Sequence, residues 1–118
     1  MNKDWKAATQ GTVKVVGELG KSLPEVVEGF AKMNRAAAAE GVLSAKTKEL
    51  IALAISVATR CDACIALHTR AAVKMGITRE EFLEMLGVAI YMGGGPSYTY
   101  SAQALEAYDQ LSAAQAPS

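Results

Sequence analysis

Both cysteines of the chain and its only histidine fall within the segment RCDACIALH, which runs from Arg60 to His68. On a helix, Cys61 and Cys64 share one face, and their Cα atoms come within the ~4.4–6.8 Å that a disulfide spans. His68 follows Cys64 by four residues and shares that face, where an imidazole can accept the thiol proton or stabilise a thiolate. The segment predicts two-electron thiol oxidation followed by disulfide closure.

Two effects favour different cysteines as the more reactive thiol: a position at the start of the helix favours Cys61, and proximity to the histidine favours Cys64. If Cys61 opens the helix, its sulfur faces unpaired backbone N–H groups and the positive end of the helix dipole, which lower a thiol pKa. Cys64 is instead the cysteine within reach of His68. The two effects leave the choice of the attacking thiol open.

Two other interpretations fit the same residues. The two cysteines and the histidine could supply three zinc ligands, although the chain has no further Cys or His to complete the set, and a carboxylate or water would have to do so. The cysteines could also be inert and the histidine a satisfied core residue, because free cysteine is often buried for packing alone. We predict the redox pair, with no metal and no cofactor.

Length and composition indicate a small helical domain. At 118 residues the chain is long enough for a core of its own, and we expect residues 1–118 to form a single domain. The sequence is 51% hydrophobic but only 6% aromatic, which favours closely packed helices. Because so short a chain cannot hide all of these apolar positions alone, we expect an oligomer.

Charge and hydropathy argue against several classes of partner. Twelve basic residues balance twelve acidic ones, so the net charge gives no reason to expect nucleic acid or an anionic membrane as a partner. The N-terminal MNKDWKAATQ lacks the apolar region of a signal peptide, and no apolar run reaches the ~18–20 residues of a membrane span. We therefore expect a cytoplasmic protein, in which a C-x-x-C pair indicates a catalytic or redox-sensing dithiol.

Apolar spacing predicts five or six helices, and the first two of them precede the long apolar run that leads into the reactive segment. A weak helix or arm is expected over about residues 4–19, with Trp5 as a packing or subunit-contact anchor. Ser22 is the expected N-cap of a second helix, Met33 is expected to fill the core, and Gly41 is expected just past the helix end.

Further helix boundaries are predicted after the reactive segment. Gly76 suits the position just past the end of the cysteine-bearing helix, and Thr78 begins a capping box that opens the next one. The glycine run at 93–96 is expected to break the chain, with Ser97 or Thr99 capping the last helix.

Glu49 joins the reactive residues only if the chain bends before the cysteines. One helix over residues 45–75 would far exceed the common ~8–20 residues, and Thr59 or Asp62 can cap a new helix at the cysteines. If the chain doubles back, Glu49 and His68 lie at similar depths, ~12–17 Å from the bend. The carboxylate can then orient or charge the imidazole. The alternative is an exposed first-turn carboxylate paired with a lysine.

The pattern E-x11-C-x2-C-x3-H resembles the alkylhydroperoxidase D-like group of the carboxymuconolactone decarboxylase superfamily; it comprises Glu49, Cys61, Cys64 and His68. The similarity is strongest over residues 44–76, and the segment GGGPSYTYSAQALEAY is similar to the closing helix of the family. The resemblance implies an all-α fold, assembly into homo-trimers or homo-hexamers, and dithiol peroxidase or related disulfide chemistry.

The resemblance also implies a role for each reactive residue. Cys64 would attack the hydroperoxide and Cys61 would resolve the sulfenate, while His68 and Glu49 relay protons through water. An external dithiol, lipoyl- or thioredoxin-like, would reset the disulfide. One position departs from the pattern, because full-length peroxidases carry a further histidine just before the second cysteine, where this chain has Ala63.

We therefore expect a peroxidase-type thiol oxidoreductase with an all-α fold. Two alternatives come from other functional classes. A lactone decarboxylase-like enzyme would need His68 and Glu49 but not the cysteines, and that branch of the superfamily usually lacks the cysteine pair. A non-catalytic redox sensor would form the same disulfide but would change partner binding or oligomeric state instead of turning over.

Overall fold

The computed structural model describes residues 3–115, and this part of the chain folds into six α-helices with no strand. In chain order the helices are α1 (Trp5–Ser22), α2 (Pro24–Ala38), α3 (Ala45–Ala58), α4 (Asp62–Lys74), α5 (Arg79–Gly93) and α6 (Gly95–Gln115). The prediction of an all-α fold with five or six helices is confirmed.

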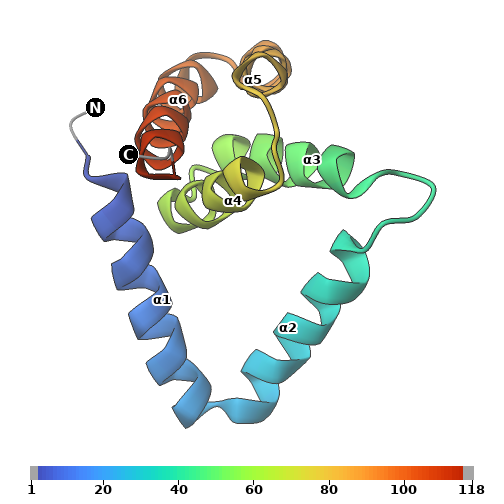
Figure 1. The fold of residues 1–118 in the computed structure, drawn as a ribbon, viewed down its shortest axis with the longest axis vertical. Coiled ribbons are helices and arrows are strands. Elements are labelled where there is room, and N and C mark those ends of the chain that lie inside the picture. The colour runs from blue at the N-terminus through green and yellow to red at the C-terminus, as the bar shows by residue number, and fades with distance from the viewer. Residues whose placement is uncertain (1–2, 116–118) are drawn as a thin grey trace.

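Helices α3 to α6 pack together as the body of the molecule (Figure 1). Helix α4 lies between α3 and α6, and α5 contacts the same two helices. The rings of Phe82 on α5 and Tyr108 on α6 have centroids 4.8 Å apart, and the Tyr108 hydroxyl donates a hydrogen bond to the Ile77 carbonyl at 2.7 Å. This contact ties α6 to the loop that follows α4. Other fully buried core residues are Leu53, Val57, Ile65 and Ala72.

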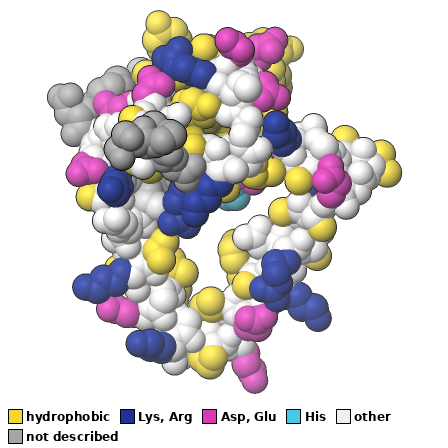
Figure 2. Space-filling view, in the orientation of Figure 1, with side chains coloured by type: hydrophobic (Ala, Val, Ile, Leu, Met, Phe, Trp, Pro, Cys, Tyr) yellow, Lys and Arg dark blue, Asp and Glu magenta, His cyan; other side chains and the backbone are white. Residues whose placement is uncertain are grey.

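Helices α1 and α2 extend from the body as a V, which we call the arm (Figure 1). The start of α1 is anchored by Trp5, which is fully buried. Its backbone N–H and indole N–H donate to Gln110 at 2.7 Å and Glu106 at 3.0 Å, both on α6. By contrast, none of the residues of α2 is buried, and hydrophobic side chains are visible along both helices of the arm (Figure 2).

The structure of the arm differs from three of the predictions. Helix α1 continues past the expected range of 4–19, because isolated glycines weaken a helix by only ~1 kcal/mol each and do not end it. Ser22 is consequently the last residue of α1, and Leu23 joins the two helices without a capping side chain. Met33 is 60% exposed and fills no core in this chain. Trp5, however, has the packing role predicted for it.

The predicted glycine cap of α2 is also wrong. The helix ends at Ala38, and Ala39 already has an extended backbone with φ −62° and ψ 144°. Its carbonyl accepts a hydrogen bond from Lys48 Nζ on α3 at 2.6 Å. A long-range lysine contact thus satisfies a carbonyl at this helix end, and Gly41 lies beyond it in the loop.

The predicted capping box at the start of α5 and the predicted break at the glycine run are confirmed, whereas the predicted cap of the last helix is wrong. Thr78 and Glu81 form the predicted capping box. The chain turns at Gly94, where φ is 73°, and α6 begins at the next residue. Ser97 and the nearby Thr99 therefore lie inside α6 and do not cap it. The junction is tight, because a Cβ at Gly93 would come within 2.7 Å of the Ser97 Cβ.

Candidate redox site

A tight turn separates α3 from α4 and begins the reactive segment. The N–H of Arg60 donates to the Val57 carbonyl and the N–H of Cys61 donates to the Ser56 carbonyl, both at 3.1 Å. These two hydrogen bonds define a Schellman motif, whose left-handed position is occupied by Arg60 with φ 57°. The predicted break in the long apolar helix is confirmed, and the chain doubles back at this turn.

Cys61 is the N-cap of α4, and its Sγ accepts the N–H of Cys64 at 3.2 Å. The prediction that Thr59 or Asp62 caps this helix is wrong, because Thr59 is the C-cap of α3 and Asp62 is already the first residue of α4. A disulfide joins the two cysteines, whose Cα atoms are 5.2 Å apart, and both residues are partly exposed. After reduction, the sulfur of Cys61 lies where unpaired helix N–H groups and the helix dipole stabilise a thiolate.

The doubling back of the chain brings Glu49 of α3 against His68 of α4. His68 Nδ1 and Glu49 Oε1 are 2.7 Å apart, the carboxylate is buried and the imidazole is about one third exposed. The hydrogen bond to Glu49 raises the pKa of His68 above its ordinary value, burial opposes that increase, and the negative charge of Glu49 adds to it. The bend that this contact requires was predicted. The alternative, an exposed Glu49 paired with a lysine, is wrong, because Glu49 is buried and contacts His68.

A small cavity of about 140 Å³ adjoins the Glu49–His68 pair. One wall comes from the last turns of α2, and Lys48 of α3 contributes to the rim; the residues of α2 are Asn34, Ala37 and Ala38. These three residues were not predicted from the sequence. They belong to an alanine-rich run without a motif, and only the fold of the arm carries them to the histidine.

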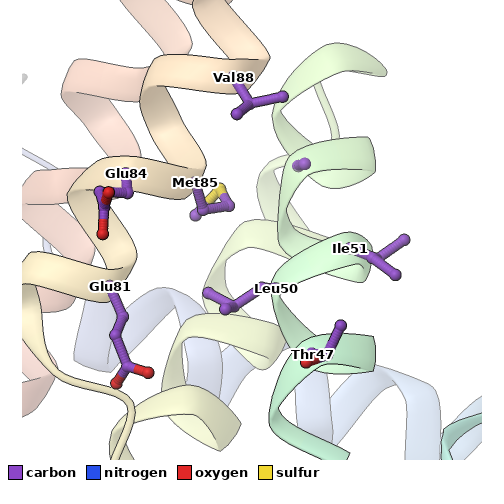
Figure 3. A pocket seen from close by; sticks show the side chains of 8 residues that line it. Thr47, Leu50, Ile51, Glu81, Glu84, Met85 and Val88 are labelled. Atoms are coloured by element: carbon purple, nitrogen blue, oxygen red, sulfur yellow. The ribbon is translucent and has the colours of Figure 1, made fainter. Parts of the chain in front are cut away.

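A larger groove of about 470 Å³ lies between α3 and α5, away from these residues. Leu50 and Met85 point into the space between the two helices, with Glu81 and Glu84 along the α5 side (Figure 3). The carboxylate of Glu81 is engaged in the capping box, where it accepts the N–H of Thr78 at 2.8 Å. Because neither Cys nor His is among its eight lining residues, this larger groove has no group suited to thiol chemistry.

Metal clusters and membrane spans are both absent from the described range. Within residues 3–115, no three His, Cys, Asp or Glu side chains gather closely enough to hold a metal ion. The helices of this range also include none that is long and apolar enough to cross a membrane.

Comparison with known proteins gives a consistent family. The model of the carboxymuconolactone decarboxylase family matches residues 24–107, a range that contains both cysteines, His68 and Glu49. A protein of uncharacterized function from Haemophilus influenzae is 47% identical over 108 residues, which cover 92% of this chain and 96% of the relative. Another, from Cupriavidus necator, is 38% identical over 113 residues, which cover 96% of this chain and 100% of the relative.

A solved structure extends the likeness to the fold. The crystal structure of an apo carboxymuconolactone decarboxylase family protein from Legionella pneumophila matches with a TM-score of 0.89 and 45% sequence identity. The match covers 92% of this chain and 96% of that one. The alkylhydroperoxidase D-like group, which the four-residue pattern resembles, lies within the same superfamily. The sequence match and the shared fold together show that this chain belongs to the carboxymuconolactone decarboxylase family.

Proposed function

We propose that the protein is a thiol oxidoreductase that reduces hydroperoxides by cycling Cys61 and Cys64 between a dithiol and a disulfide. The observation that carries this proposal is the 2.7 Å contact between His68 and Glu49. His68 lies about one helical turn beyond Cys64 on the same helix. A dithiol followed by an imidazole that a carboxylate orients has both the nucleophile and the base that the reaction needs.

The proposed cycle starts from the reduced protein. His68 Nε2 takes the proton of Cys64, directly or through water, because Nδ1 is engaged by Glu49. The thiolate attacks the terminal peroxide oxygen, the O–O bond breaks, and the alkoxide leaves as an alcohol after taking a proton. Cys64 is now a sulfenic acid. The Cys61 thiol attacks that sulfur, which forms the disulfide and releases water.

An external dithiol completes the cycle, because the protein has no other thiol to reduce the disulfide. The incoming thiolate attacks one sulfur of the pair, forms a mixed disulfide and then closes into its own disulfide. A lipoyl- or thioredoxin-like carrier has the required chemistry. The partial exposure of both cysteines supports access by such a partner.

The test is intact mass spectrometry with thiol trapping, on reduced protein given a stoichiometric pulse of hydrogen peroxide or cumene hydroperoxide. The expected result is a rapid loss of two hydrogens that an added dithiol reverses. Removing a general base typically slows a reaction by 10²–10⁴-fold, so His68→Ala should slow disulfide formation within that range, and Glu49→Gln by less. Glu84→Gln, in the groove between α3 and α5, serves as a matched control and should react at the wild-type rate.

Cysteine variants separate the steps and the competing functions. Cys61→Ser should stop at a trappable sulfenic acid, whereas Cys64→Ser should not react with the pulse. Thiols that stay free for hours would overturn the redox proposal. A reversible disulfide without turnover under any dithiol would leave a redox sensor. Lactone decarboxylation that survives the double Cys→Ser change would establish the decarboxylase alternative.

A further inference from the structure

Lys3 precedes α1 and is held at four points. Its ammonium forms an ion pair with the Asp62 carboxylate and lies 4.8 Å from the centroid of a Trp5 ring. Its backbone N–H donates to Glu106 Oε1 at 3.3 Å, and its carbonyl accepts a hydrogen bond from Gln110 Nε2 at 2.8 Å. A surface lysine ordinarily loses much rotamer freedom when it is fixed in one geometry. Here the backbone contacts hold the residue independently of the ion pair.

The partner of this ammonium has a special position. Asp62 is the first residue of α4 and follows Cys61 directly in the chain. A carboxylate in the first turn interacts favourably with the helix dipole, but it disfavours a second negative charge on a nearby sulfur. The helix end that bears the cysteines therefore carries a group that opposes thiolate formation.

We infer that Lys3 is a positioning residue of the redox pair, whose ammonium offsets the Asp62 charge and so favours thiolate formation in the Cys61–Cys64 pair. The inference rests on the proposed function, because a thiolate is the species that attacks a hydroperoxide. Lys3 acts through Asp62, which stands 59 residues away in the sequence, so the beginning of the arm and the redox helix are linked by charge.

Other charged groups around this helix end remain the same in the variants that test the inference. They are the exposed Arg60, the Glu106 carboxylate of α6 and the Glu49–His68 pair. Substituting Lys3 or Asp62 leaves them in place, so the shift in each single variant reports on the charge that the substitution removes.

The experiment measures how the thiolate of the fully reduced, full-length protein forms with pH, from its ultraviolet absorbance and its alkylation rate. Lys3→Met removes the charge and keeps an unbranched side chain beside Trp5, and it should raise the midpoint by about half to one pH unit. Asp62→Asn should lower the midpoint by a similar amount. Both magnitudes correspond to about one unit charge near the sulfur in a partly solvated site. Lys21→Met, an exposed lysine at the far end of α1, should leave the midpoint unchanged.

Opposite signs in the single variants distinguish charge compensation from loss of structure. The double variant Lys3→Met/Asp62→Asn should return to the wild-type midpoint, and Lys3→Arg should keep it. Midpoints that move in the same direction, or do not move, overturn the inference. If Lys3→Met does not fold, Lys3→Gln takes its place: a higher midpoint supports the role of Lys3, and an equal or lower one refutes it.

None of these measurements uses a peroxide, so the two proposals fail separately. A protein with the expected shifts but no peroxide turnover would overturn the proposed peroxidase activity and keep the role of Lys3. A protein that turns over peroxide with unshifted midpoints in the Lys3 and Asp62 variants would overturn the role of Lys3 alone.

Discussion

His68 Nδ1 and Glu49 Oε1 are 2.7 Å apart, and a carboxylate in its ionised form can only accept a hydrogen bond. The proton of the neutral imidazole therefore resides on Nδ1, and Nε2 keeps the lone pair that a thiol or water can use. When Nε2 is protonated, the same carboxylate stabilises the imidazolium, which can in turn stabilise a thiolate. One contact thus sets both the direction and the proton affinity of the base.

The raised pKa of His68 gives the first prediction. Glu49→Gln removes the negative charge and leaves only a neutral, weaker acceptor beside the imidazole, while burial still lowers the pKa of His68, so this pKa should fall toward or below its ordinary value of 6.5. Because the chain has one histidine, the ring protons give a single set of NMR signals to follow against pH. The control is Glu84→Gln, and an unchanged midpoint in Glu49→Gln would contradict the assignment of Glu49 as the cause.

The same pair makes stability depend on pH. The folded-state pKa of His68 is raised above the unfolded value, so the stabilisation from its ion pair is fully present below about pH 6.5. It is lost as the pH rises through the folded-state pKa. Urea unfolding of the wild type should show the free energy of unfolding declining across that interval, and Glu49→Gln should flatten the decline. An equal decline in both proteins would mean that another group is responsible.

At the scale of elements, two helices end in the same motif with different residues. Helix α4 ends in a Schellman motif in which Gly76 takes the left-handed position, with φ 79°. Helix α3 ends in the same pair of hydrogen bonds, but the left-handed residue is Arg60 with φ 57°. A side chain in this conformation costs roughly 1–2 kcal/mol, whereas glycine adopts it freely. The turn before the cysteines is therefore a strained version of the turn after them.

The contrast predicts opposite effects of glycine exchange at the two ends. Arg60→Gly should raise the free energy of unfolding by about 0.5–1 kcal/mol, because relief of strain exceeds the added freedom of the unfolded chain. Gly76→Ala should lower it by about 1 kcal/mol. Chemical denaturation of the oxidised proteins measures both changes. Destabilisation by Arg60→Gly would show that the arginine side chain contributes more than its backbone strain costs.

These two turns also show what local sequence can and cannot predict. Gly76 predicted its turn, as Thr78 predicted its capping box, because the residue types themselves favour those conformations. The bend at Arg60 was inferred only from the length of the apolar run. A helix opening at Cys61 was one of the possibilities considered, but the cap was assigned to Thr59 or Asp62, because those residue types favour that position. Residues that meet only through the fold gave no signal, among them Lys3 beside Asp62 and the α2 residues beside His68.

At the scale of the whole molecule, the arm leaves an apolar stripe uncovered. Val26, Phe30 and Met33 repeat at helical spacing along α2 and are 66%, 65% and 60% exposed. Val27, on another side of the helix, instead packs toward Gly20 of α1. An isolated helix of 15 residues is marginal in water, and α2 buries none of its own residues. The sequence predicted that Met33 would fill the core, whereas the body of the same chain leaves it open.

A second copy of the chain is the occupant that we expect on this stripe. The other helix of the arm, α1, also exposes apolar side chains, which include Val13, Val16 and Leu19. A contiguous apolar patch beyond a few hundred Å² marks an interface, and a twofold assembly buries one such patch against itself. Twofold pairing of arms would join two trimers into the hexamer that the family resemblance implies, but it would not by itself form a trimer.

Light scattering coupled to size exclusion measures that assembly. The wild type should run as a multimer, and Phe30→Glu should reduce its mass, because a carboxylate in the centre of the stripe would be buried without a partner. Lys32→Glu introduces the same side chain on the charged side of α2 and should leave the mass unchanged. Since Asn34 and Ala37 wall the cavity beside His68, dissociation should also loosen α2 over the site and speed hydrogen exchange in that helix. A wild type with the mass of one chain and rapid exchange throughout α2 would contradict self-assembly through the arm.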